Sequence, residues 1–101
     1  QTAVSSSLES SIRQTLRRDG RQILRVTAPE PDWNIVTNPL TGVIVKRELR
    51  VAAAEKFGDG HCEVNFYYVS QKYTGSGYTA GVYYESEATD GYDIDLKDVY
   101  R

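Results

Sequence analysis

The second half of the chain alternates apolar and polar residues over long stretches, and groups of turn-forming residues interrupt that alternation. A period of two is typical of a β-strand with one buried face. The interruptions are Asn38–Gly42, Gly58–Gly60, Gly75–Gly77 and Asp90–Gly91. Short turns of this kind join consecutive antiparallel strands, whereas parallel strands need long crossovers. The pattern therefore predicts a meander of antiparallel strands.

Each predicted strand has one face that we expect to point into the core. The expected inward faces are Val43, Val45, Leu49, Val51 and Ala53; Cys62, Val64, Phe66 and Tyr68; Tyr78, Ala80, Val82 and Tyr84; and Tyr92, Ile94 and Leu96. Arg47 interrupts the first of these faces, which indicates a bulge or a strand end that overhangs the core. Two shorter strands, Gln22 to Thr27 and Trp33 to Val36, are predicted before the meander.

A single helical pattern precedes the strands. Leu8, Ile12 and Leu16 recur every four residues and form one apolar stripe. Ser6 and Glu9 have the spacing of a capping box, and Gly20 can end the helix. We predict a helix over residues 7–19, after a flexible segment over residues 1–6. This helix is too short to be stable alone, so its stripe must pack on the sheet.

Together these elements predict an α+β fold in one domain over residues 1–101, with strands between residues 22 and 96. The helix would lie against one face of a curved four- to five-stranded antiparallel sheet. This arrangement resembles the general shape of the cystatin and NTF2-like architectures. A small half-open β-barrel with the helix plugging one end is the alternative.

Composition excludes several classes of protein. No apolar run approaches the ~18 residues that a membrane-spanning helix needs, so we expect no membrane span. Residues 1–50 contain eight Lys and Arg against five Asp and Glu, a net charge of +3, and residues 51–101 contain four against nine, a net charge of −5. Basic residues are not concentrated as in a nucleic-acid-binding protein, so we expect no nucleic-acid partner. The chain begins with Gln1 and small residues, which favours an exported protein after removal of a signal peptide.

Few residues suit catalysis or metal binding. His61, Cys62 and Glu63 are consecutive, but neighbouring strand residues point to opposite faces, so His61 cannot easily activate Cys62. His61 and Glu63 share a face and can pair. Asp90, Asp93 and Asp95 are weak candidates for calcium ligands, although their spacing matches no EF-hand loop. We therefore expect no enzyme, no cofactor and no metal ion bound elsewhere.

Tyrosine is the most unusual component of the second half. The pairs Tyr67-Tyr68 and Tyr83-Tyr84 must each place one ring on each face of the sheet. With Cys62 and Tyr78 counted as inward, Tyr67 and Tyr83 would form an exposed platform suited to binding another protein. Gln71 to Gly75 resembles the Gln-x-Val-x-Gly loop with which cystatins bind papain-like proteases, with Tyr73 in place of the valine.

The sequence thus favours a non-catalytic protein–protein interaction module, an exported accessory, assembly or inhibitory protein. We expect it to dock through a tyrosine-rich sheet face or an edge strand, onto another protein or onto a second copy of itself. The expected contact residues are Trp33, Tyr67, Gln71, Tyr73 and Tyr83. The alternative is a small-molecule-binding pocket protein or a small NTF2-like enzyme, with its cavity between helix and sheet.

Overall fold

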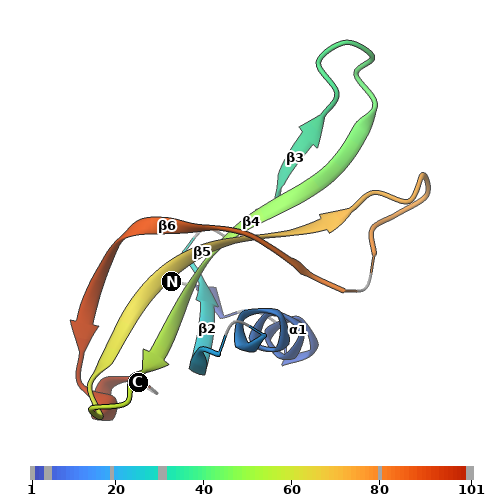
Figure 1. The fold of residues 1–101 in the computed structure, drawn as a ribbon. Coiled ribbons are helices and arrows are strands. Elements are labelled where there is room, and N and C mark those ends of the chain that lie inside the picture. Colours follow the sequence, from blue (N-terminus) through green and yellow to red (C-terminus); the bar gives the residue numbers. More distant parts are fainter. Residues whose placement is uncertain (1, 4–5, 19, 30–31, 80, 100–101) are drawn as a thin grey trace.

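The computed structural model describes residues 2–3, 6–18, 20–29, 32–79 and 81–99, and the side chains of residues 2–3 and 88–90 lie outside the described part. The elements shown in Figure 1 are β1 (Thr2–Ala3), α1 (Ser6–Arg17), β2 (Gln22–Ala28), β3 (Asn34–Thr37), β4 (Ile44–Lys56), β5 (Cys62–Lys72), β6 (Tyr83–Ile94) and the 3₁₀ helix η1 (Leu96–Asp98). Among the described residues, no helix has the length and apolar character needed to cross a membrane.

One antiparallel sheet of six strands organises the molecule, in the order β1-β2-β4-β5-β6. β3 also pairs with β4, so β2 and β3 follow one another along the same side of that long strand. The sheet is open, which confirms the predicted α+β class and makes the barrel alternative wrong. The β3–β4 hairpin and the end of β5 extend beyond α1, and the molecule measures 48 × 24 × 23 Å (Figure 1). We call these extensions the projecting hairpins.

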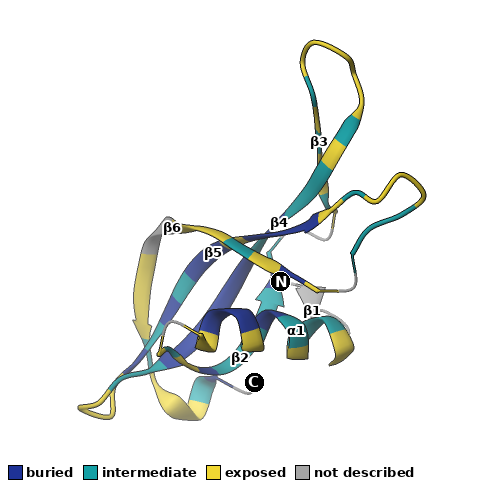
Figure 2. Cartoon of the chain, turned by 45° about the vertical axis from the view of Figure 1, so that its right-hand side comes forward, coloured by how far each residue is buried: buried dark blue, intermediate teal, exposed yellow. Residues whose placement is uncertain are grey.

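Helix α1 covers one face of the lower half of the sheet, as its apolar stripe predicts (Figure 2). Ile12 and Leu16 are fully buried there against strand residues such as Val51. Leu49, Val51 and Ala53 point inward from β4 as expected, whereas Val45 is 47 % exposed because its part of β4 overhangs the core. The helix–sheet interface is therefore packed with side chains.

The predicted inward face of β5 is wrong. Tyr67 is 1 % exposed and lies in the core under the helix, together with Val69. Phe66 and Val64 lie on the opposite face, where they form a small apolar cluster with Ala52. β4 sets this phase, because Val51 points toward the helix and Tyr67 is its direct partner across the ladder. Tyr67 therefore cannot belong to an exposed docking platform.

Three further expectations need correction. Thr2 and Ala3 pair with β2, so the segment before the helix is not entirely unstructured. Helix α1 begins at Ser6, and the Glu9 carboxylate accepts a hydrogen bond from the backbone N–H of Val26 (2.8 Å) instead of completing a capping box. The Asp90–Gly91 pair is not a turn: β6 runs continuously from Tyr83 to Ile94, with a register irregularity opposite Asn65.

Candidate functional site

An arginine stacked on two aromatic rings lies at the base of the projecting hairpins. The Arg47 guanidinium carbon is 4.2 Å from the centre of the Trp33 ring and 4.3 Å from that of Tyr78. Arg47 Nε and Nη2 also donate to Oε1 of Gln71, at 2.8 and 2.6 Å. The Tyr73 ring packs edge-on against Tyr78, with ring centres 5.3 Å apart. Three of the five predicted contact residues, Trp33, Gln71 and Tyr73, therefore gather around Arg47.

Tertiary structure explains why Arg47 interrupts an otherwise apolar strand face. Arg47 follows the inward face of β4 past the end of the helix, where aromatic rings replace the helix as its packing partners. Trp33 in turn contacts the main core, so the stack is anchored to the body of the protein. Each cation–π contact contributes about 0.5–2 kcal/mol, depending on how far it is removed from water. The arrangement holds the guanidinium in a fixed orientation.

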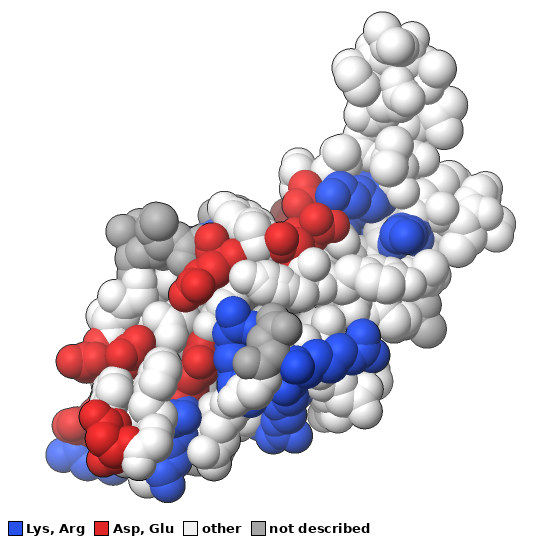
Figure 3. All heavy atoms as spheres, viewed as in Figure 1, with Lys and Arg blue, Asp and Glu red and all other residues white. Residues whose placement is uncertain are grey.

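No carboxylate of the described residues forms an ion pair with Arg47; its hydrogen-bond acceptor is the neutral amide of Gln71. Residues 33–47 and 69–83 contain Lys46, Arg47 and Lys72 and no Asp or Glu at all. Figure 3 shows the result: acidic side chains lie over β6 and the lower end of the sheet, and the projecting hairpins carry none. Among the described residues, the positive charge of Arg47 is therefore not paired with a carboxylate.

Exposed apolar side chains continue this surface. Ile35 is the direct cross-strand partner of Arg47 and is 46 % exposed, and Leu40 and Val43 are exposed at the tip of the β3–β4 hairpin. The term hairpin surface is used below for Trp33, Ile35, Arg47, Gln71, Tyr73 and Tyr78. It combines aromatic, aliphatic and guanidinium groups in one place, the composition that dominates binding energy at protein interfaces.

The opposite face of the sheet, which the helix does not cover, carries the exposed tyrosines. Tyr83 is 44 % exposed, as predicted, but its neighbour on this face is Tyr68 rather than Tyr67. Tyr92 is exposed further along the same face, where its ring lies 6.3 Å from that of Phe66. The Lys72 amine approaches the Tyr83 ring at 5.3 Å. The uncovered face of the sheet therefore carries exposed tyrosines, as predicted. They are Tyr68, Tyr83 and Tyr92, whereas the prediction paired Tyr83 with Tyr67.

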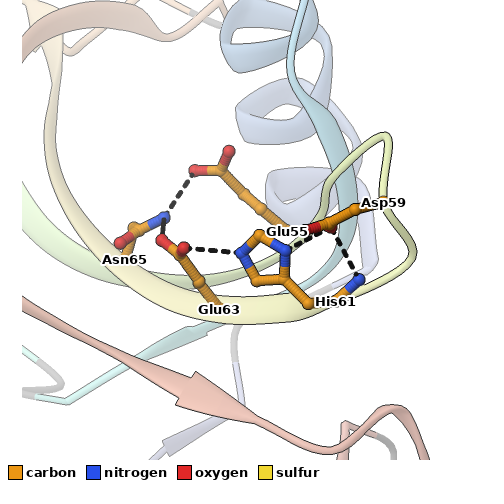
Figure 4. A network of polar contacts seen from close by, with 5 residues as sticks. All are labelled: Glu55, Asp59, His61, Glu63 and Asn65. Carbon is orange, nitrogen blue, oxygen red and sulfur yellow. Dashed lines mark hydrogen bonds and ion pairs between the residues drawn. The ribbon is translucent and has the colours of Figure 1, made fainter.

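A polar network occupies the helix-side face at the lower end of the sheet (Figure 4). One ring nitrogen of His61 contacts the Asp59 carboxylate, and the other lies 2.8 Å from Oε2 of Glu63. Asn65 donates to Oε1 of both Glu63 (3.4 Å) and Glu55 (3.3 Å). The predicted pairing of His61 with Glu63 is confirmed. Hydrogen bonds to Glu63 and Asp59 raise the pKa of His61, since both carboxylates stabilise the protonated ring.

Glu55 is the most buried carboxylate of this network, with 4 % of its surface exposed. The Tyr67 hydroxyl donates to its Oε1. Burial raises the pKa of Glu55 above its ordinary value, while the hydrogen bond from Asn65 and the charge of Arg21 act in the opposite direction. Burial dominates because removing a carboxylate from water disfavours its charged form.

Glu55, Glu63 and Asp93 stand directly opposite one another on three adjacent strands. His61, Glu63 and Asp93 each offer one potential ligand atom, all within 4.8 Å of one another, so this group could hold a metal ion. Asp95, a predicted calcium candidate, does not belong to this group among the described residues, and the side chain of Asp90 lies outside the described part. The expectation that Asp90, Asp93 and Asp95 bind calcium stays a prediction, because the side chain of one of the three lies outside the described part.

The catalytic alternative gains no geometric support at the histidine. Both ring nitrogens of His61 face carboxylates, and the Cys62 thiol is free and buried. A nucleophile–base pair needs a hydrogen bond between the two side chains, and the His61 ring makes its contacts elsewhere.

Both long edges of the sheet carry features that oppose strand addition. On β2, side chains of α1 bind the backbone: Glu9 accepts from Val26, Arg13 donates to the Leu24 carbonyl and Arg17 donates to that of Ile23. β6 contains two register irregularities and the charged residues Glu85, Glu87 and Asp93. Bulges and charged side chains are common protection against edge pairing. Strand addition at β2 or β6 is therefore less favoured than docking through a surface.

Sequence reasoning missed Arg47 and Tyr78 as site residues. The interruption of the β4 pattern was a usable signal that Arg47 has an unusual environment. Trp33 lies 14 residues before Arg47 and Tyr78 lies 31 residues after it, so periodicity within one strand could not show the stack.

Comparison of the chain with protein-family models, with curated proteins and with solved structures gives no match. The likeness to cystatins and NTF2-like proteins is therefore one of element order only, and function has to be argued from the residues themselves.

Proposed function

We propose that this chain is a non-catalytic binding module that docks onto another protein through the hairpin surface. The observation that carries the proposal is the stack of Arg47 between Trp33 and Tyr78, held by Gln71 and without a carboxylate partner in the described part of the chain. Arg, Trp and Tyr are the residues most enriched at binding hot spots. Because packing already fixes the Arg47 orientation, little side-chain entropy is lost when a partner binds.

The chemistry of the surface defines the partner. The Arg47 guanidinium suits an anionic group, and the exposed Ile35 beside it and Leu40 and Val43 at the hairpin tip suit an apolar surface. The fitting partner is a folded protein that presents an Asp or Glu side chain within an apolar patch. Such a charge pair is removed from water on binding, and losing one member leaves the other buried and unpaired.

Site-specific crosslinking tests the proposal. A photoreactive amino acid placed at Ile35 should capture the partner, whereas one placed at the exposed Ser10 on α1 should not. The captured protein is then purified and its affinity is measured by calorimetry. Arg47→Met should weaken binding by at least thirtyfold, the equivalent of about 2 kcal/mol for a hot-spot residue.

The matched control is Arg18→Met, because Arg18 is exposed and distant from the hairpins. This control should leave the affinity unchanged. Equal affinity of the purified partner for the Arg47→Met and parent proteins would refute docking through this surface. Crosslinking of Ile35 to a second copy of the chain, with the same sensitivity to Arg47→Met, would show that the partner is the protein itself and would replace the proposed partner.

A further inference from the structure

A groove crosses the uncovered face of the sheet. It has a volume of about 420 Å³ and is lined by Asp32, Asn34, Glu48, Arg50, Tyr68 and Ser86. These residues come from the start of β3 and from β4, β5 and β6. Arg50, Tyr68 and Ser86 are direct neighbours across the ladders, so the groove runs perpendicular to the strands. Four strands at a separation of about 4.8 Å give it a length of about 14 Å.

Four polar side chains of the groove have no hydrogen-bond partner within the described part of the chain, so a ligand can bind them. Arg50 lies over the Phe66 ring at 4.2 Å, and among the described residues its guanidinium makes no hydrogen bond or ion pair. The Tyr68 hydroxyl and the side chains of Asn34 and Ser86 likewise have no hydrogen-bond partner within the described part of the chain. In water these groups bind solvent, which a ligand with matching groups can replace.

Four of the lining side chains are planar and two-pronged. Arg50 offers parallel N–H donors, Asp32 and Glu48 offer paired acceptor oxygens, and the Asn34 amide offers one of each. Adjacent hydroxyl groups on a ring fit such two-pronged groups, because each hydroxyl can both donate and accept. Two carboxylates against one guanidinium oppose an anionic ligand, and the single net negative charge gives only a weak attraction for a cationic one. The donor and acceptor set therefore suits a neutral molecule rich in hydroxyl groups.

Exposed tyrosine rings in and beside the groove also suit a hydroxyl-rich ligand. Tyr68 is 37 % exposed within the groove, and Tyr83 and Tyr92 are exposed on either side of it along the same face. A tyrosine ring offers an apolar face for C–H groups and a polar hydroxyl for solvent or ligand. A peptide would fit less well, because the backbone groups of a sheet face are already engaged in the ladders and the peptide backbone would find no partner there.

We infer that this groove binds a neutral oligosaccharide, with hydroxyl pairs on Asp32, Asn34, Glu48 and Arg50 and one sugar face on Tyr68. The inference is independent of the hairpin surface, because Arg47 and its aromatic neighbours lie on the other face of β4. A length of about 14 Å suits a short chain of sugar units rather than a single one.

NMR titration of the ¹⁵N-labelled full chain tests the inference. The probes are maltohexaose, cellohexaose and N-acetylchitohexaose, each to about 10 mM, enough to detect a dissociation constant of about 1 mM. At least one should cause saturable shifts at Arg50, Tyr68 and Ser86. Arg50→Met should weaken that binding at least tenfold, and Arg18→Met, at an exposed residue just after α1, should not change it.

Ser86→Phe is the second variant, because Ser86 is exposed and a phenyl ring there fills the groove without disturbing the core. It should abolish binding while leaving the remaining spectrum unchanged. The inference is overturned if none of the three probes shifts the groove resonances, or if Ser86→Phe binds as well as the parent. Tighter binding of the anionic hexagalacturonate than of the neutral probes would overturn the argument from charge.

Discussion

Replacement of Tyr67 by alanine tests the assignment of the two faces of β5. Tyr67 is 1 % exposed, packs edge-on against Tyr84 with ring centres 6.1 Å apart, and lies under the Arg21 guanidinium at 5.1 Å. Removing a buried aromatic side chain costs about 3–5 kcal/mol, from lost burial and the remaining cavity. The variant also removes the hydroxyl that donates to the buried Glu55 carboxylate. We therefore expect loss of most of the stability of a small domain.

The assay is thermal and urea unfolding, followed by circular dichroism. For a domain of this size, 1 kcal/mol shifts Tm by about 4–8 °C, so Tyr67→Ala should lower Tm by about 15–30 °C or prevent folding. Tyr67→Phe keeps the packing and removes only the hydroxyl. We expect this variant to lower the free energy of unfolding by about 1–3 kcal/mol, because the buried Glu55 carboxylate loses a hydrogen-bond donor. The matched control is Tyr83→Ala, on the uncovered face, with an effect below about 1 kcal/mol. Equal Tm values for Tyr67→Ala and Tyr83→Ala would refute the structure-based phase of β5.

Two further substitutions test the lower half of the sheet. Burial raises the pKa of Glu55, so the folded state holds this proton more tightly than the unfolded state, and stability is lost as pH rises from the ordinary Glu value through the raised folded value. Glu55→Gln should therefore stabilise the protein at pH 7 in urea unfolding, with the gain disappearing as pH falls below the ordinary Glu value; an unchanged gain at low pH contradicts the reasoning. At Gly91, an added Cβ would clash with Asn65 Oδ1 and would lie 3.2 Å from the Val64 carbonyl oxygen. Gly91→Ala should lower the free energy of unfolding by about 1–3 kcal/mol. Gly77→Ala, with open space around the added Cβ, should leave it nearly unchanged. Similar urea midpoints for the two variants would contradict the close approach at Gly91.

Several elements could be predicted because one local pattern determined each. The four-residue spacing of Leu8, Ile12 and Leu16 is compatible only with a helical stripe. Along β4, the larger side chains of Leu49 and Val51 define the inward face, because Glu48 and Arg50 occupy the other face beside them. The helix and the central strand were therefore predictable from sequence.

The phase of β5 could not be predicted in the same way, because both of its faces carry apolar residues. Val64 and Phe66 compete with Tyr67 and Val69, and alternation alone gives no preference. Register with β4 decides between them, and register is a long-range property. Glu63 and Asn65 further obscure the inward face, since both lie on the helix side where the sheet meets solvent beyond the helix.

The turn predicted at Asp90–Gly91 failed for a related reason. A glycine after an aspartate favours a turn locally, but it also permits close approach of two backbones. In this chain Gly91 lies against Val64 and Asn65 across the ladder, so the strand continues. A single sequence does not distinguish the two uses of glycine.

The two proposed binding surfaces have a common origin in β4. Arg47 and Arg50 are three residues apart on this strand and so point to opposite faces. Each stacks on aromatic rings, Arg47 on Trp33 and Tyr78 and Arg50 on Phe66, and neither forms an ion pair with a described carboxylate. Because the sheet separates them, a ligand on one face leaves the other accessible. Substitution of either arginine should therefore affect one binding activity only, which makes the failure of one proposal distinguishable from the failure of the other.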